Sequence, residues 1–207
     1  MALGTVTVPH ELRFDAGRLC LDLLATTHPV ERLDSAEALR AWITGSGLVP
    51  PGTPLDHADA AWLPGFRDLR AQTARLVRGC LRAPARTRPA PGARPREAAL
   101  ARVNDLARAA PPAPRAVRGE DGVLVRELAG EPQREALLAA LARDAVELLT
   151  DPADRARLRQ CEGDNCPIVY LDTSRGRRRR WCSSEVCGNR ERVARHRRRA
   201  ALADRPG

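Results

Sequence analysis

Cys161-Glu-Gly-Asp-Asn-Cys166 and Cys182-Ser-Ser-Glu-Val-Cys187 are two cysteine pairs with the same internal spacing, and fifteen residues separate them. Four thiolates suit Zn²⁺, which has no ligand-field preference and accepts a closed tetrahedron of soft donors. Two such pairs around a loop are typical of structural zinc sites in short segments. The sequence therefore predicts one structural zinc ion per chain, bound by Cys161, Cys166, Cys182 and Cys187, with a small domain folded around it.

The basic residues are concentrated around the same cysteines. Between residues 155 and 199 the chain carries fourteen arginines and five acidic residues, which accounts for the whole net charge of +9. A localised basic surface is typical of proteins that bind a polyanion, and nucleic acid is the partner we expect. The chain contains no lysine, which indicates a compositional bias towards arginine. A solvated face, a membrane surface and an acidic protein partner are therefore the alternatives.

The remaining composition is that of a globular protein of the cytoplasm. Hydrophobic residues make up 43% of the 207 positions, enough for one core and a small module. No stretch approaches the roughly 20 apolar residues of a membrane span. Residues 1–9 lack the basic and apolar regions of a signal peptide. We expect no membrane partner, and we expect the paired cysteines to stay reduced rather than form disulfides.

Helical periodicity dominates residues 1–150, which we predict to form a sensor or dimerisation domain. Asp34-Ser-Ala-Glu37 resembles a capping box that opens a helix ending at Gly45. Two strand-like segments, 115–118 and 123–128, predict a β-hairpin. The expected fold is mainly α-helical with this one small hairpin. Further amphipathic helices are predicted over residues 66–80, 100–106 and 132–149, and the second of them is expected to bury one face formed by Leu100, Val103 and Leu106.

Residues 151–207 are predicted to form the zinc finger. Residues 168–171 read as a strand that returns through a turn at 173–178 to a second strand ending at Trp181. A helix is expected to run from Cys187 towards Leu202, with Ser183 or Ser184 as its cap. Such a hairpin followed by a helix resembles a treble clef. The residues of this helix that we expect to face the finger's interior are Val186, Val193 and Ala200.

Three motifs together resemble a known family. They are Gly17-Arg-Leu-Cys-Leu-Asp22, the stretch from Asp172 to Trp181 before the third cysteine, and Cys187-Gly-Asn-Arg190. The last two resemble the CGNR zinc finger. The first resembles the start of the ABATE domain, which precedes this finger in bacterial proteins described as stress-induced transcription regulators. The resemblance implies a DNA-binding regulator, and a pocket for an unidentified small molecule in the first domain. The candidate pocket residues are Arg18, Cys20, Asp22 and Thr26.

The arginines near the zinc ligands are the candidate nucleic-acid contacts. Most would neutralise phosphates, and one or two on the helix could read guanine edges in a major groove. An RNA-binding or ribosome-associated module and a protein-interaction finger stay open as alternatives, and so does a homodimer. The candidate residues are Arg177, Arg178, Arg179, Arg180, Arg190, Arg192, Arg195, Arg198 and Arg199.

The sequence argues against an enzyme. Four thiolates leave zinc no open position for a reactive water, so a catalytic zinc site is disfavoured. The chain has no Gly-x-Ser-x-Gly nucleophile elbow, and its four histidines are scattered. Cys20 and Cys80 are expected to be buried apolar residues rather than nucleophiles.

Overall fold

The computed structural model describes residues 12–82 and 94–203. Residues 1–9, on which the expectation about a signal peptide rests, lie outside these ranges. The described chain is mainly helical, with two small antiparallel hairpins. No helix in the two ranges is long and apolar enough to cross a membrane. The elements are α1 (Leu19–Ala25), α2 (Ala36–Gly45), the short 3₁₀ helix η1 (Ala60–Trp62), α3 (Leu63–Arg82), α4 (Arg94–Ala107), β1 (Pro114–Arg118), β2 (Leu124–Leu128), α5 (Arg134–Thr150), α6 (Pro152–Arg157), β3 (Leu158–Gln160), β4 (Val169–Leu171) and α7 (Cys187–Ala203).

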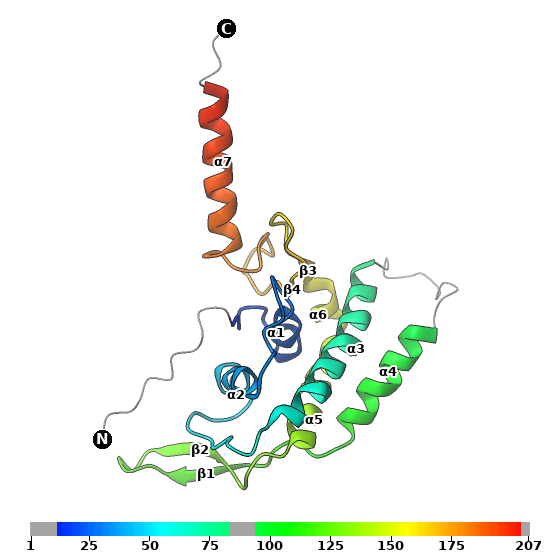
Figure 1. The fold of residues 1–207 in the computed structure, drawn as a ribbon, viewed down its shortest axis with the longest axis vertical. Coiled ribbons are helices and arrows are strands. Elements are labelled where there is room, and N and C mark those ends of the chain that lie inside the picture. Colours follow the sequence, from blue (N-terminus) through cyan, green and yellow to red (C-terminus); the bar gives the residue numbers. More distant parts are fainter. Residues whose placement is uncertain (1–11, 83–93, 204–207) are drawn as a thin grey trace.

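Helices α3, α4 and α5 pack against one another, and α1 lies across α3 and α5 (Figure 1). The predicted stripes on α3 and α5 are confirmed, because Leu69, Val77 and Leu141 are buried. On α4 the prediction is wrong at Leu100, which is 47% exposed. Val103 is buried as predicted, and Ala99 takes the place of Leu100 in the core.

The first hairpin and α2 lie close to their predicted positions. Strands β1 and β2 pair antiparallel with Val117 opposite Val125, as the strand pattern indicates. Helix α2 begins one residue later than the capping box suggested, because Ser35 is the N-cap and its hydroxyl accepts the Ala38 N–H. A single short side chain thus sets the start of this helix.

The second hairpin differs from the prediction. Strand β4 pairs with β3, so that Tyr170 lies opposite Arg159, and no strand ends at Trp181. Side chains, not a strand ladder, fix the returning segment: the Tyr170 hydroxyl donates to the Arg179 carbonyl (2.5 Å), and an Asp172 carboxylate oxygen accepts the Arg179 N–H (3.2 Å). These two bonds satisfy both backbone groups of Arg179, and the neighbouring Arg180 carbonyl accepts the Glu162 N–H (2.9 Å).

One buried cluster runs from the helical bundle into the finger. It includes Leu21 of α1, Leu141 of α5, and Leu171 of β4. The Leu171 N–H donates to the Ala16 carbonyl (2.8 Å), which attaches the finger to the segment before α1. Gly17 makes this approach possible, because its φ is +89° and a Cβ there would lie 3.2 Å from the Cβ of Leu171.

Helix α7 projects away from the rest of the molecule (Figure 1). Cys187 and Gly188 are buried, but Val186 and Val193 are 45% and 44% exposed. The prediction that these valines face the finger's interior is therefore wrong, and the side chain of Ala200 lies outside the described residues. The reason is the direction of the helix, which leaves the finger after its first turn, so that no other helix or strand of residues 12–82 and 94–203 packs along it.

Candidate metal centre and nucleic-acid interface

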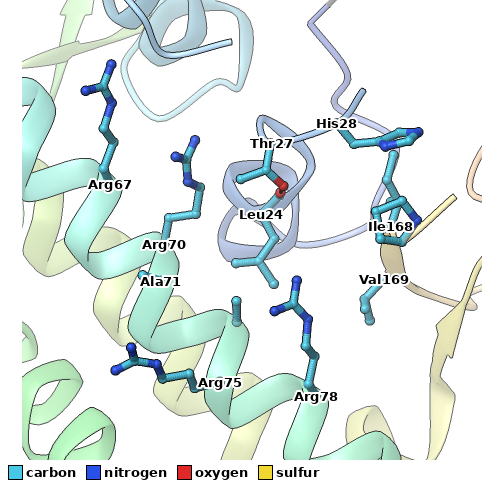
Figure 2. A pocket seen from close by; sticks show the side chains of 12 residues that line it. Leu24, Thr27, His28, Arg67, Arg70, Ala71, Arg75, Arg78, Ile168 and Val169 are labelled. Carbon is cyan, nitrogen blue, oxygen red and sulfur yellow. Dashed lines mark hydrogen bonds between the residues drawn. The ribbon is translucent and has the colours of Figure 1, made fainter. Parts of the chain in front are cut away.

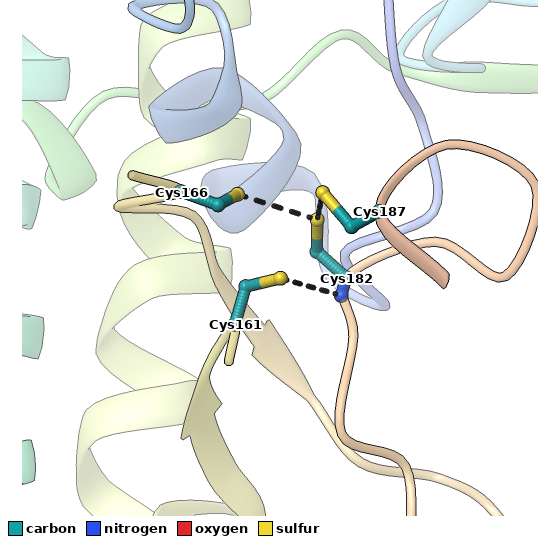
Figure 3. A group of neighbouring side chains, drawn as sticks. All are labelled: Cys161, Cys166, Cys182 and Cys187. Carbon is teal, nitrogen blue, oxygen red and sulfur yellow. Dashed lines mark hydrogen bonds between the residues drawn. The ribbon is translucent and has the colours of Figure 1, made fainter. Parts of the chain in front are cut away.

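The four paired cysteines converge from four different local structures (Figure 3). Cys161 follows β3, Cys166 comes shortly before β4, Cys182 lies in the loop after Trp181, and Cys187 opens α7. All four are buried, and their Sγ atoms lie within 4.8 Å of one another. The Sγ atoms of Cys166 and Cys182 are 3.7 Å apart, and those of Cys182 and Cys187 are 3.6 Å apart. A tetrahedron with Zn–S bonds of about 2.3 Å has edges of about 3.8 Å, so the donor set fits zinc.

Backbone and side-chain donors surround the sulfurs. Cys161 Sγ accepts N–H groups from Cys182 (3.3 Å) and Gly163 (3.4 Å), and Cys182 Sγ accepts from the Arg13 guanidinium (3.2 Å). Gly163 gives the sulfurs room, because a Cβ there would lie only 3.3 Å from the Cβ of Cys187 and would press on this zinc ligand. Donors aimed at thiolate sulfur offset its negative charge and orient the ligands.

Two thiols of this cluster, those of Cys182 and Cys187, resist ionising on their own. Burial raises the pKa of Cys187 to about 11, and the nearby Cys182 sulfur adds to that shift. A hydrogen bond with Cys166, followed by burial, raises the pKa of Cys182. Four thiolates therefore need a bound cation to exist together, and a divalent ion with four sulfur ligands has no free position for substrate.

Two family models match the sequence. The ABATE model, described as "Putative stress-induced transcription regulator", matches residues 17–152, which is more than half of the chain. The chain belongs to the ABATE family. The model of the CGNR zinc finger matches residues 157–200, which include all four clustered cysteines. No curated protein matches the chain. The finger of this ABATE chain holds one structural zinc ion, and its two families are of regulator and zinc-finger type rather than enzymes.

The predicted arginines on α7 are exposed, as a contact surface requires. Arg192 donates to the Ser184 carbonyl (3.3 Å), and Arg198 lies 3.7 Å from the Glu191 carboxylate. The side chain of Arg199 lies outside the described residues. The exposed set that the structure describes is Arg190, Arg192, Arg195, Arg197 and Arg198.

The four arginines before Trp181 separate into two kinds. Arg177 and Arg178 are exposed, and within the described ranges their side chains make no hydrogen bond. Arg179 points inward: it donates to the carbonyls of Trp181 (2.8 Å), Asp15 (2.9 Å) and Cys182, and its guanidinium lies 4.5 Å from the centre of the Tyr170 ring. Arg180 is exposed but paired with Glu162 at 2.6 Å. Arg179 therefore holds the finger together and is not available to a phosphate.

The candidate pocket residues of the first domain form ion pairs and hydrogen bonds within the protein and line none of the cavities described for residues 12–82 and 94–203. Arg18 forms ion pairs with Asp144 (2.9 Å), Glu147 (3.0 Å) and Asp154 (3.4 Å) and so links α1, α5 and α6. The Asp22 carboxylate accepts the Ala16 N–H at 2.9 Å. Arg18 therefore fixes α1 against α5 and α6, and Asp22 holds the backbone of Ala16, whose carbonyl accepts the Leu171 N–H of the finger.

The other two residues of that set are also engaged. The backbone N–H of Cys20 donates to Asp144 (2.8 Å), and burial raises the pKa of its thiol, which keeps the thiol protonated. Thr26 Oγ1 accepts from Arg70 (2.7 Å) and donates to the Leu23 carbonyl (2.6 Å). Neither side chain lines the cavities described in this structure.

Sequence reasoning missed two residues that support the site. Arg13, far away in the sequence, contributes the side-chain donor to Cys182, and no local pattern marks it. Asp172 is buried, and its carboxylate accepts the N–H and hydroxyl of Ser174 at 3.0 and 2.6 Å. An Asp two residues before a Ser is typical of an Asx-turn, so the second residue left a readable signal.

Proposed function

We propose that the chain is a DNA-binding transcription regulator of the bacterial stress response that acts in the cytoplasm. Residues 151–207 would contact DNA, and residues 1–150 would serve as the sensor or dimerisation domain. The change of family model between residues 152 and 157 supports this division of roles. A reducing compartment supports the location, because the zinc ligands must stay as thiolates.

The free-standing helix α7 is the observation that carries the proposal. At 17 residues and 1.5 Å per residue it is about 25 Å long. The zinc site fixes its first turn, and the described remainder is almost entirely exposed and rich in arginine. A helix that is polar all round lacks the packing that normally stabilises helices. A DNA major groove about 12 Å wide would supply both the missing packing and the negative charge.

The exposed arginines outside α7 extend the same basic surface. Arg177 and Arg178 lie on the loop of the finger, where phosphate contacts would add affinity without reading sequence. Phosphates bound there would fix the register of the helix on the duplex. The arginines of α7 are better placed to reach base edges.

The test is the salt dependence of DNA binding by the full, zinc-loaded chain. If about five arginines contact phosphates, log affinity falls against log salt with a slope of about −4.5. Arg178→Ala flattens that slope by about one unit and weakens all duplexes alike. The double variant Arg195→Ala/Arg198→Ala lowers the ratio of specific to random binding. Arg126→Ala, an exposed arginine on the β1–β2 hairpin, is the matched control and changes neither quantity.

Competition separates the proposal from its alternatives. Duplex DNA displaces a labelled duplex, whereas a stronger effect of duplex RNA or single strands would indicate the RNA-binding alternative. A flat salt dependence in the zinc-loaded chain would indicate a protein-interaction finger and contradict the proposal.

A further inference from the structure

A cavity of about 280 Å³ lies where the helical bundle meets the zinc finger (Figure 2). Thr27 and His28, just after α1, form one wall, and one face of α3 forms the second. Residues 167–169 of the finger, directly after the zinc ligand Cys166, form the third wall. The cavity is therefore lined by residues from both the ABATE domain and the CGNR zinc finger.

The α3 wall is strongly cationic. Arg67, Arg70, Arg75 and Arg78 all line the cavity, and no acidic residue is among the lining residues. Three of these arginines are already engaged: Arg70 pairs with Glu31 at 2.5 and 2.7 Å, Arg67 donates to the Leu33 carbonyl, and Arg75 donates to the side-chain oxygen of Gln72 (3.1 Å). These contacts hold the three guanidiniums in place but leave the cavity with an excess of positive charge.

Arg78 is the cation best placed to bind an anion. It is exposed, and within the part of the chain that the structure describes its side chain makes no hydrogen bond or ion pair. Figure 2 shows it rising from α3 into the space between Leu24 and Val169. An unpaired guanidinium at the mouth of a concave site is a ready partner for a carboxylate or phosphate group.

Apolar side chains lie across the cavity from the arginines. Leu24, Ile168 and Val169 contribute aliphatic surface there, and Ala74 adds a small apolar surface on α3 itself. Burial lowers the pKa of His28, with Arg13 and Arg190 adding to that shift, so this ring adds no positive charge near neutral pH. A site with a cationic wall and an apolar wall selects a molecule that has both an anionic and an apolar end.

We propose that this cavity binds a small organic anion, such as a carboxylate or a phosphate monoester that carries a short apolar group. The anionic end pairs with Arg78, and the apolar end packs on Leu24, Ile168 and Val169. The volume is near the lower limit of small-molecule sites, which suits a single ring or a short chain. A DNA backbone would satisfy the arginines but would leave the apolar wall unused.

The experiment is calorimetric titration of the full, zinc-loaded chain at constant ionic strength with four probes. Benzoate and phenyl phosphate carry both groups, benzamide lacks the charge, and inorganic phosphate lacks the ring. We expect the first two to bind at least about tenfold more tightly than the last two. Equal binding of benzoate and benzamide would overturn the anion requirement. Inorganic phosphate binding as tightly as phenyl phosphate, or no binding of any probe, would overturn the proposal as well.

Two variants place the binding in this cavity. Arg78→Gln removes the charge from an exposed position and weakens benzoate at least about tenfold. Ala71→Leu, at an exposed position on the α3 wall, fills the cavity and has the same effect on benzoate. Arg126→Gln on the distant hairpin is the control and leaves binding unchanged. Each variant is checked by thermal unfolding, and full benzoate affinity in a folded Arg78→Gln protein would overturn the assignment.

Discussion

Helices α5 and α7 each contain 17 residues, but they are stabilised in opposite ways. Seven residues of α5 are buried, and its apolar side packs against α1, α3 and α4. In α7 only Cys187 and Gly188 are buried among the side chains that the structure describes. Hydrophobic burial holds the first helix along its whole length, whereas metal coordination holds the second at one end.

The two helices are therefore available for different roles. The apolar face of α5 is buried in the core, so its residues contribute to stability and are not accessible to a partner. The α7 surface remains free, and its arginines repel one another at close helical spacing until an anion lies between them. A helix that is costly to maintain without a partner is a natural place for binding.

The largest effect is expected from loss of the metal. Chelation, or Cys182→Ser, removes the tetrahedron that anchors α7, and structural zinc sites contribute on the order of 10 kcal/mol to folding. We expect amides in α7 to lose protection in hydrogen-exchange mass spectrometry, while amides in α5 keep theirs. Cys80→Ser, which changes a half-buried cysteine outside the cluster, is the control. Retention of α7 protection in zinc-free protein would show that the helix has another source of stability.

The second prediction compares single side chains on the two helices. Leu141→Ala removes a fully buried side chain from α5 and is expected to lower the free energy of unfolding by about 2–5 kcal/mol. Val193→Ala on α7 is expected to change it by less than about 0.5 kcal/mol, because the valine is 44% exposed and lies outside the buried core. Chemical denaturation of both variants measures the difference. A large cost at Val193 would mean that α7 packs against something, such as a second copy of the chain.

Sequence predicted most helices because amphipathic spacing reports which face is buried, as at Leu69 and Leu141. Spacing also predicted the four zinc ligands, since metal chemistry restricts both residue type and separation. It failed at Val193 because a heptad spacing names a face but does not say whether anything lies against it. Spacing also could not identify Arg179 within a run of identical arginines. This side chain turns inward because it contacts the Asp15 carbonyl, which is far away in the sequence, and the ring of Tyr170.

The third and smallest effect concerns Asp22, which lies in α1 close to the junction between the helical bundle and the zinc finger. Burial raises the pKa of Asp22 to about 7; Asp15 and Asp144 act in the same direction, whereas the Ala16 N–H and Arg179 oppose the shift. The unfolded chain releases this proton near pH 3.9, about three units lower. The folded protein therefore holds a proton that the unfolded chain has lost, and its stability falls as pH rises through about 7.

Asp22→Asn removes this titration, and the amide oxygen of the new side chain can still accept the Ala16 N–H. Between about pH 6 and about pH 8.5 the parent protein is expected to lose roughly 1.4 kcal/mol of unfolding free energy relative to the variant. Denaturant unfolding of both zinc-loaded proteins across this range measures the difference, in which the zinc ligands cancel. Asp56→Asn, at an exposed carboxylate, should run parallel to the parent. Parallel curves for Asp22→Asn would mean that this carboxylate is already ionised at pH 6 and that its hydrogen bond, not its proton, holds the segment before α1 against the finger.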